Sequence, residues 1–81
     1  MSTVTVQLFA SYAESFGRST LEIPIVPGVT VSDLIARLRA LPGAHVLPAV
    51  PRVAINRQFA APDQLIHPRD EVALIPPVAG G

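Results

Sequence analysis

The sequence contains no cysteine, which excludes disulfide bonds, thiolate zinc sites and thiol nucleophiles. Lysine is also absent, so the six positive side chains are all arginines, and six acidic side chains balance them to a formal net charge of zero. Nucleic acids and anionic membranes attract clustered positive charge, so we expect neither as the main partner. Hydrophobic residues make up 49% of the chain, which argues against disorder.

No segment has the pattern of a signal peptide or a membrane-spanning helix. The first basic residue is Arg18, so the positively charged start of a signal peptide is missing. The longest apolar run, residues 72–79, contains two prolines and is too short to span a bilayer. At 81 residues the chain has room for one small domain. We therefore expect a single cytoplasmic domain.

Two segments near the N-terminus alternate between apolar and polar side chains, which is the period of a half-buried strand. The apolar positions are Val4, Val6 and Leu8 in the first segment and Leu21, Ile23 and Ile25 in the second. The link between them is short and ends in Gly17, a turn residue. The sequence therefore predicts a β-hairpin.

The one helix that the sequence predicts begins at Thr30. Thr30 is a favourable N-cap, and Asp33 places a carboxylate in the first turn, where the helix dipole stabilises it. Apolar residues then recur at helical spacing along one stripe, at Val31, Leu34, Ile35, Leu38 and Leu41. The pair Pro42 and Gly43 is expected to end the helix.

The second half of the chain adds further strands. Arg52–Ile55 and residues 71–75 have strand patterns, Asn56–Arg57 is typical of a turn, and a short strand is expected around residues 65–66. This order predicts an α+β fold, a β-grasp (ubiquitin-like) roll with a mixed sheet packed on one main helix. We expect the β-grasp domain to cover residues 1–76 and an extended C-terminal Gly-Gly tail to cover residues 77–81.

Three bulky apolar residues are expected on the face of the sheet that the helix leaves open. Phe9 and Ile75 reach that face by strand parity, and Phe59 follows the turn at Asn56. If the three lie close together they form a binding patch. The alternative is that loops cover them.

No group of side chains has the spacing of a catalytic or metal site. His45 and His67 lie 22 positions apart, and neither has a second ligand at metal spacing. No serine stands in a Gly-x-Ser-x-Gly motif. We therefore expect no bound metal and no catalytic side chain.

The end of the chain combines a stiff base with side chains that shrink toward the carboxylate: Pro76, Pro77, Val78, Ala79, Gly80 and Gly81. Two prolines favour an extended path, and residues 77–81 could reach about 15 Å beyond the domain. Terminal glycines let the main chain enter a tunnel too narrow for a Cβ atom. A carboxylate becomes an acyl donor once ATP activates it as an acyl-adenylate, and a chain that is itself the acyl group needs no catalytic side chain. The alternative is a frayed terminus.

Four segments, spread through nearly the whole chain, carry a family resemblance: residues 8–17 (LFASYAESFG), 29–38 (VTVSDLIARL), 53–56 (VAIN) and 70–81 (DEVALIPPVAGG). They resemble the small subunit of molybdopterin synthase, the MoaD family of ubiquitin-like sulfur carriers. The Pro-Pro-Val-x-Gly-Gly ending is the most specific part. Pro68 and Arg69 stand where this family commonly has a glycine-containing turn, a departure that concerns the local turn and not the function.

The resemblance implies that the C-terminal carboxylate of Gly81 carries sulfur. An E1-like adenylating enzyme would activate it with ATP and Mg²⁺, and a sulfur donor protein would convert it to a thiocarboxylate. The tail would then enter the large subunit of molybdopterin synthase, within a heterotetramer, and give sulfur to cyclic pyranopterin monophosphate in molybdenum cofactor biosynthesis. Related carriers dock through the positions of Phe9, Phe59 and Ile75. The chain would be the non-catalytic sulfur-donor subunit and would hold no permanent cofactor.

Three other functions remain open. The chain could be a sulfur carrier for thiamin or tRNA thiolation, although thiamin carriers are generally shorter and lack the Pro-Pro pair. It could be a ubiquitin-like modifier that is joined to lysines of other proteins. It could also be a non-covalent β-grasp interaction module whose tail is incidental.

Overall fold

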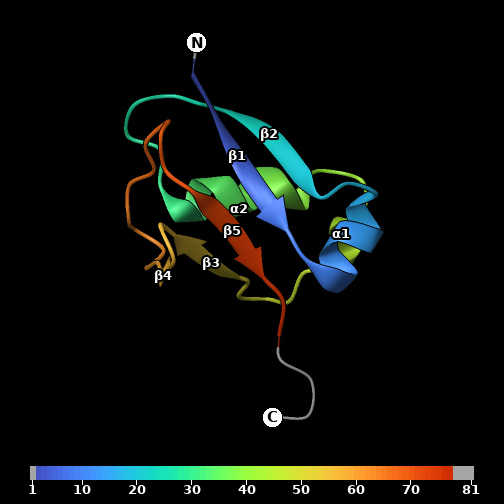
Figure 1. The fold of residues 1–81 in the computed structure, drawn as a ribbon. Coiled ribbons are helices and arrows are strands. Elements are labelled where there is room, and N and C mark those ends of the chain that lie inside the picture. The colour runs from blue at the N-terminus through green and yellow to red at the C-terminus, as the bar shows by residue number, and fades with distance from the viewer. Residues whose placement is uncertain (1, 78–81) are drawn as a thin grey trace.

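A computed structural model describes residues 2–77, within which a mixed sheet of five strands packs against one main helix (Figure 1). In chain order the elements are β1 (Ser2–Leu8), α1 (Ala10–Phe16), β2 (Thr20–Ile25), α2 (Val31–Arg39), the short 3₁₀ helix η1 (Ala44–Val46), β3 (Arg52–Ile55), β4 (Gln58–Phe59) and β5 (Val72–Ile75). The strand order across the sheet is β2-β1-β5-β3-β4. The pair β1–β5 is parallel and the other pairs are antiparallel. These elements confirm the predicted β-grasp fold.

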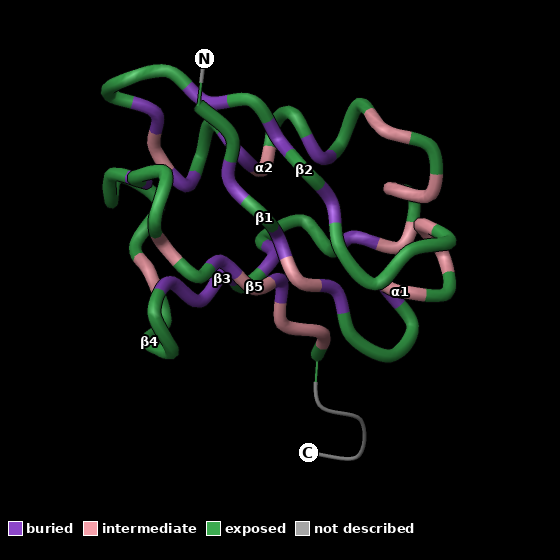
Figure 2. The backbone as a smooth tube through the Cα atoms, turned by 45° about the horizontal axis from the view of Figure 1, so that its top comes forward, coloured by how far each residue is buried: buried purple, intermediate pink, exposed green. Residues whose placement is uncertain are grey.

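The alternating pattern of the strands builds the core. In β1, Val4 and Val6 are buried while Thr5 between them is exposed, and the cross-strand partners Ile23 and Leu21 are buried as well. Burial alternates along β1 and β2 in Figure 2. Figure 1 shows α2 behind the sheet, covering this apolar side, while the face toward the viewer carries no helix.

Local chemistry starts the main helix where the sequence predicted it. The Thr30 side chain accepts a hydrogen bond from the Asp33 backbone N–H at 3.2 Å, and the Asp33 carboxylate accepts one from the Thr30 N–H at 3.0 Å. This reciprocal capping box satisfies two N–H groups that the helix itself leaves free. Leu34 and Leu38 are buried against the sheet. Leu41, the last residue of the predicted stripe, lies past the helix end and is half-buried.

The predicted antiparallel pairing of β1 and β2 is confirmed, but their connection is a second helix, α1, in place of a simple turn. The two strands pair as expected, but Ala10–Phe16 is helical and buries Tyr12. Gly17 ends α1 in the left-handed conformation with a φ of 75°. The Ser15 hydroxyl donates a hydrogen bond to the Gly43 carbonyl at 2.8 Å, so α1 is held from a distant part of the chain. A helix this short with one buried residue shows no helical period in the sequence.

The predicted short strand around residues 65–66 is wrong. Leu65 forms an isolated bridge with Thr30, and the extra strand is β4, which pairs with β3. Asn56 and Arg57 make the connecting turn with φ values of 53° and 70°. Two left-handed residues are the signature of a tight hairpin turn, and they direct the chain back along β3. A two-residue strand is too short for an alternating pattern to identify it.

The chain leaves the sheet at the end of β5. Pro76 is half-buried and Pro77 is exposed, whereas Val78, Ala79, Gly80 and Gly81 lie outside the described residues. The division into a domain at 1–76 and a tail at 77–81 therefore stays a prediction. In residues 2–77 no helix has the length and apolar character needed to cross a bilayer.

Candidate functional site

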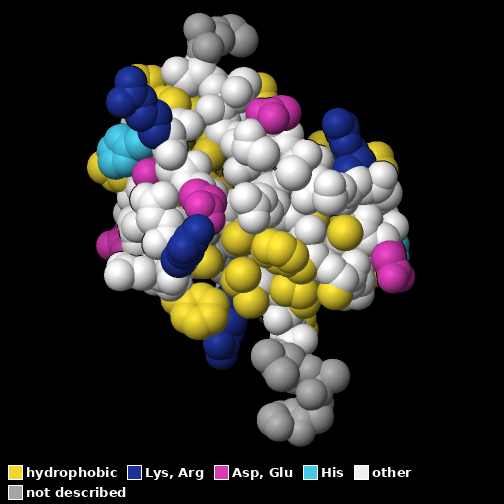
Figure 3. All heavy atoms as spheres, viewed as in Figure 1, with side chains coloured by type: hydrophobic (Ala, Val, Ile, Leu, Met, Phe, Trp, Pro, Cys, Tyr) yellow, Lys and Arg dark blue, Asp and Glu magenta, His cyan; other side chains and the backbone are white. Residues whose placement is uncertain are grey.

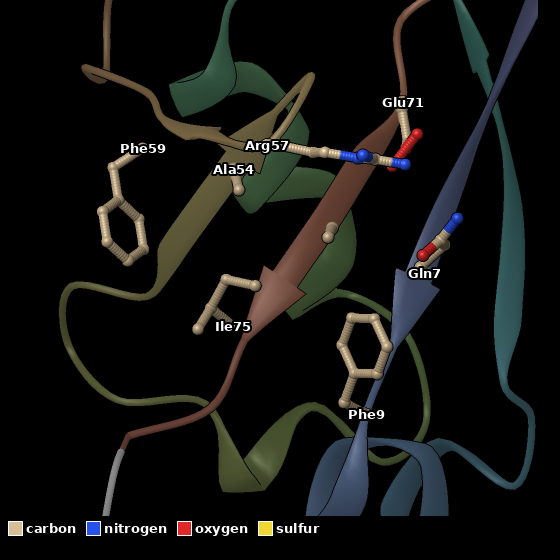
Figure 4. A pocket seen from close by; sticks show the side chains of 8 residues that line it. Gln7, Phe9, Ala54, Arg57, Phe59, Glu71 and Ile75 are labelled. Carbon is tan, nitrogen blue, oxygen red and sulfur yellow. The ribbon is translucent and has the colours of Figure 1, made fainter.

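Apolar side chains gather on the open face of the sheet, over β5 and beside it (Figure 3). A hollow of about 280 Å³ lies there, and side chains of β1, β3, β4 and β5 contribute to it (Figure 4). Phe9, Phe59 and Ile75, the three residues predicted from the sequence, all line it. The structure thus brings together residues that are far apart in the chain. We call Phe9, Phe59 and Ile75 the apolar patch.

Each residue of the apolar patch has a defined position. Phe9 directly follows β1 and is the N-cap of α1, Phe59 ends the short strand β4, and Ile75 ends β5 between them (Figure 4). Phe9 is 45% exposed and Phe59 is 67% exposed, so the loops of residues 2–77 do not cover these rings. Exposed aromatic side chains around a hollow are a typical protein docking surface.

Two alanines make the hollow possible. Ala54 of β3 lies beside Ala73 of β5 in the sheet, and it also pairs with Phe59. Both alanines line the hollow, and their small side chains leave space between the larger residues around them. Sequence reasoning missed these alanines, although the parity that places Ile75 on the open face also places Ala73 there.

The upper rim of the hollow is polar and locally ordered. Arg57 extends across the sheet toward Glu71 (Figure 4), with its Nε atom 3.7 Å from the Glu71 Oε2 atom. The Asn56 amide accepts a hydrogen bond from the Glu71 N–H at 2.9 Å and donates one to the Asp70 carboxylate at 3.1 Å. The backbone N–H of His67, 2.8 Å away, holds the pKa of Asp70 below its ordinary value. These contacts tie the β3–β4 turn to the start of β5.

A second arginine lies beside Phe59 and Ile75 of the apolar patch. The Arg52 guanidinium carbon is 5.5 Å from the centroid of the Phe59 ring, a cation–π arrangement. Arg52 pairs with Ile75 across the sheet. Both residues line a neighbouring hollow where the chain leaves the sheet, together with Phe59, Pro76 and Pro77. Sequence reasoning did not assign Arg52 to the site, but strand parity with Ile75 could have done so.

The described residues hold no arrangement suited to metal binding. Within residues 2–77 no three His, Asp or Glu side chains come close enough to share an ion. The two histidines that the sequence analysis weighed as metal ligands lie in separate elements, His45 in the 3₁₀ helix η1 and His67 in a loop. This face is suited to apolar docking, beside the point where the chain leaves the sheet toward its C-terminus. Gly81 itself lies outside the described residues.

Comparison with known proteins identifies the family. The profile of the ThiS family matches residues 6–81, which is nearly the whole chain. This chain belongs to the ThiS family. A molybdopterin synthase sulfur carrier subunit from Mycosarcoma maydis is 36% identical to this ThiS-family chain, over 98% of the chain and 94% of the relative. That similarity confirms the resemblance to molybdopterin synthase small subunits.

Solved structures agree with the fold of the ThiS-family chain. The crystal structure of small archaeal modifier protein 1 from Haloferax volcanii has a TM-score of 0.81 and 28% identity, covering 96% of this chain and all (100%) of that one. A chain in the complex of subunits 1 and 2 of molybdopterin-converting factor from Helicobacter pylori gives a TM-score of 0.72 at 22% identity, covering 98% of this chain and 99% of the other. The second likeness shows the β-grasp fold alone.

Proposed function

We propose that the chain is the sulfur carrier subunit of molybdopterin synthase. The observation that carries the proposal is the apolar patch, which lies where β5 ends and the chain turns toward a Gly-Gly terminus. A carrier needs a surface that partners can hold while its C-terminus reaches their active sites. The name of the relative from Mycosarcoma maydis supports the same function.

In this function the reacting group is the C-terminal carboxylate of Gly81. Attack of that carboxylate on the α-phosphorus of ATP, with Mg²⁺ in an E1-like adenylating enzyme, forms an acyl-adenylate and releases pyrophosphate. Hydrosulfide (HS⁻) supplied by a donor protein then attacks the acyl carbon, breaks its bond to the AMP oxygen and leaves a thiocarboxylate and free AMP. The sulfur passes to cyclic pyranopterin monophosphate, and water restores the carboxylate. The chain supplies no catalytic side chain and binds no cofactor of its own.

Because both partners use the apolar patch, they bind the chain in turn and not together. The adenylating enzyme and the large synthase subunit both need access to the same tail, so both dock on the face beside it, one after the other. Phe9, Phe59 and Ile75 supply the apolar contacts, while Pro76 and Pro77 direct the chain away from the sheet. The relative from Mycosarcoma maydis is named as a subunit of molybdopterin synthase, which supports a second synthase subunit as partner. The steps take place in the cytoplasm, and the synthase is a heterotetramer.

The decisive experiment shortens the tail by one residue, so that the terminal carboxylate falls on Gly80 and not on Gly81. The purified chain is incubated with the adenylating enzyme, ATP and a sulfur donor, and its intact mass is expected to rise by the difference between sulfur and oxygen. Deletion of Gly81 should abolish this change and sulfur transfer to the pterin, while the circular dichroism spectrum stays the same because the buried core residues, Val4 to Leu74, are all kept. Product formation by the truncated chain at the normal rate would refute the proposal.

A second function is favoured by one observation, the similarity to small archaeal modifier protein 1. As a ubiquitin-like modifier, the chain would form an isopeptide bond between Gly81 and a lysine amine of another protein. The same mass measurement in cell extract separates the two functions, because a carrier returns unattached and a modifier appears joined to larger proteins. Sulfur transfer to thiamin or tRNA precursors remains the alternative if a thiocarboxylate forms but no pterin product appears.

A further inference from the structure

The two arginines at the apolar patch have different electrostatic surroundings. Arg57 lies 3.7 Å from the Glu71 carboxylate, so this arginine has a counter-charge beside it. Arg52 is exposed, and no carboxylate of residues 2–77 lies within 4 Å of its guanidinium. The Arg52 guanidinium carbon lies 5.5 Å from the centroid of the Phe59 ring. Arg52 is therefore a cation held by an aromatic ring and not by an acid.

Docking on the apolar patch must dehydrate Arg52. It is the cross-strand partner of Ile75, it stands over Phe59, and it lines the hollow that continues to Pro76 and Pro77. A partner that covers Ile75 and Phe59 removes water from the guanidinium that lies over the Phe59 ring. A buried charge without a counter-charge costs free energy, and this cost subtracts from what the apolar contacts around it contribute. A partner that binds this face therefore needs an acidic group at this point.

We propose that the large synthase subunit places an Asp or Glu carboxylate against Arg52, beside an apolar pocket that receives Phe59. This inference rests on the proposed function, because it concerns the partner that the apolar patch docks. A guanidinium can donate two parallel hydrogen bonds to one carboxylate, and the Phe59 ring holds it in place for them. Arg57, already paired with Glu71, contributes little to docking.

The chemistry of the face selects this partner over other anions. The full chain has no net charge and Arg57 has Glu71 beside it, so Arg52 is the cation of this face that stands among apolar side chains without an acid within 4 Å in residues 2–77. A phosphate backbone or an anionic membrane requires several adjacent cations. One carboxylate surrounded by apolar residues matches one arginine surrounded by Phe59, Ile75 and Pro76.

The matched variants are Arg52→Gln and Arg57→Gln, each compared with the wild-type chain for binding to the purified large subunit of the same organism. Titration calorimetry at several salt concentrations gives the affinity and its salt dependence. Arg52→Gln should weaken binding by about tenfold or more, since it leaves a buried partner carboxylate unpaired, and should flatten the salt dependence. Arg57→Gln should change the affinity by less than about threefold, because exposed pairs contribute little.

Two further variants identify the cause of any loss. Phe59→Leu removes the aromatic ring but keeps the Arg52 charge, so binding weakens while the salt dependence remains. Arg52→Lys keeps the charge without the planar fork and should restore part of the affinity lost in Arg52→Gln. Thermal unfolding of each variant confirms that the domain is intact.

The results separate this inference from the proposed function. If Phe9→Ser weakens binding and Arg52→Gln does not, the carboxylate contact is refuted and the apolar docking stands. If neither changes binding, the docking face itself is wrong. Equal effects of Arg52→Gln and Arg57→Gln would also overturn the inference. So would dimerisation of the chain alone that Arg52→Gln abolishes, because the acid would then belong to a second copy.

Discussion

The contact between α1 and Gly43 provides the sharpest test of how the fold positions the docking face. A Cβ atom added at Gly43 would lie 2.5 Å from the Ser15 carbonyl oxygen and 2.9 Å from its carbon, both in the backbone of α1. Neither atom can move without moving the helix. Since α1 begins directly after Phe9, its displacement also disturbs the apolar patch.

Gly43→Ala has two costs that can be estimated separately. The φ of +96° is unfavourable for alanine by about 1–2 kcal/mol, of which about 0.4–1 kcal/mol is regained from the less flexible unfolded chain. The overlap with the Ser15 backbone adds about 1–3 kcal/mol. We therefore expect the free energy of unfolding to fall by about 2–4 kcal/mol, a large part of the stability of a small domain.

Gly28→Ala is the matched control, because Gly28 has a similar φ of +91° but nothing within 4 Å of its added Cβ. It should lose about 1 kcal/mol, the backbone cost alone. Urea unfolding followed by circular dichroism measures both variants, and equal m-values establish that the unfolded states are comparable. If the two substitutions destabilise the protein equally, the close approach of Gly43 to α1 does not limit the packing, and the reasoning is refuted.

Four further predictions concern the core, the acid sensitivity, the tail and the apolar patch. Tyr12→Phe should raise the free energy of unfolding by about 1–3 kcal/mol, because within residues 2–77 the buried hydroxyl has no hydrogen-bond partner; a clear loss in urea unfolding would show that the hydroxyl is satisfied. Because the pKa of Asp70 is lowered in the folded state, ionised Asp70 stabilises the fold at pH values above its ordinary pKa, and this stabilisation is lost as the pH falls below about 4. The stability advantage of the wild type over Asp70→Asn should therefore shrink at low pH, and an advantage independent of pH would contradict this. Gly80→Val should slow sulfur transfer by about 100-fold with little effect on docking, and Gly80→Ala by less; turnover near wild type in Gly80→Val would exclude a narrow tunnel. Phe9→Ser or Ile75→Ser should weaken binding to the adenylating enzyme and to the large subunit alike; a ternary complex with one copy of the chain would exclude a shared face.

Features that depend on neighbouring residues could be predicted from the sequence. The capping box needs Thr30 and Asp33 three positions apart, and the alternation of Val4, Val6 and Leu8 follows from strand geometry. These local rules place the main helix and most strands. The β-grasp fold could then be predicted from the order of these elements. The same parity put Phe9 and Ile75 on the open face, where the structure has them around one hollow.

Other features were decided only by contacts between distant segments. Helix α1 is too short to show a period, and it forms where Ser15 meets Gly43, a residue beyond the main helix. Strand β4 exists because two left-handed residues, Asn56 and Arg57, return the chain to β3. Arg57 lies beside Glu71, whereas Arg52 lies over the Phe59 ring. Both contacts depend on side-chain positions across three strands. Sequence patterns report periods along one segment, whereas these contacts depend on the distance between segments, which only the folded chain sets.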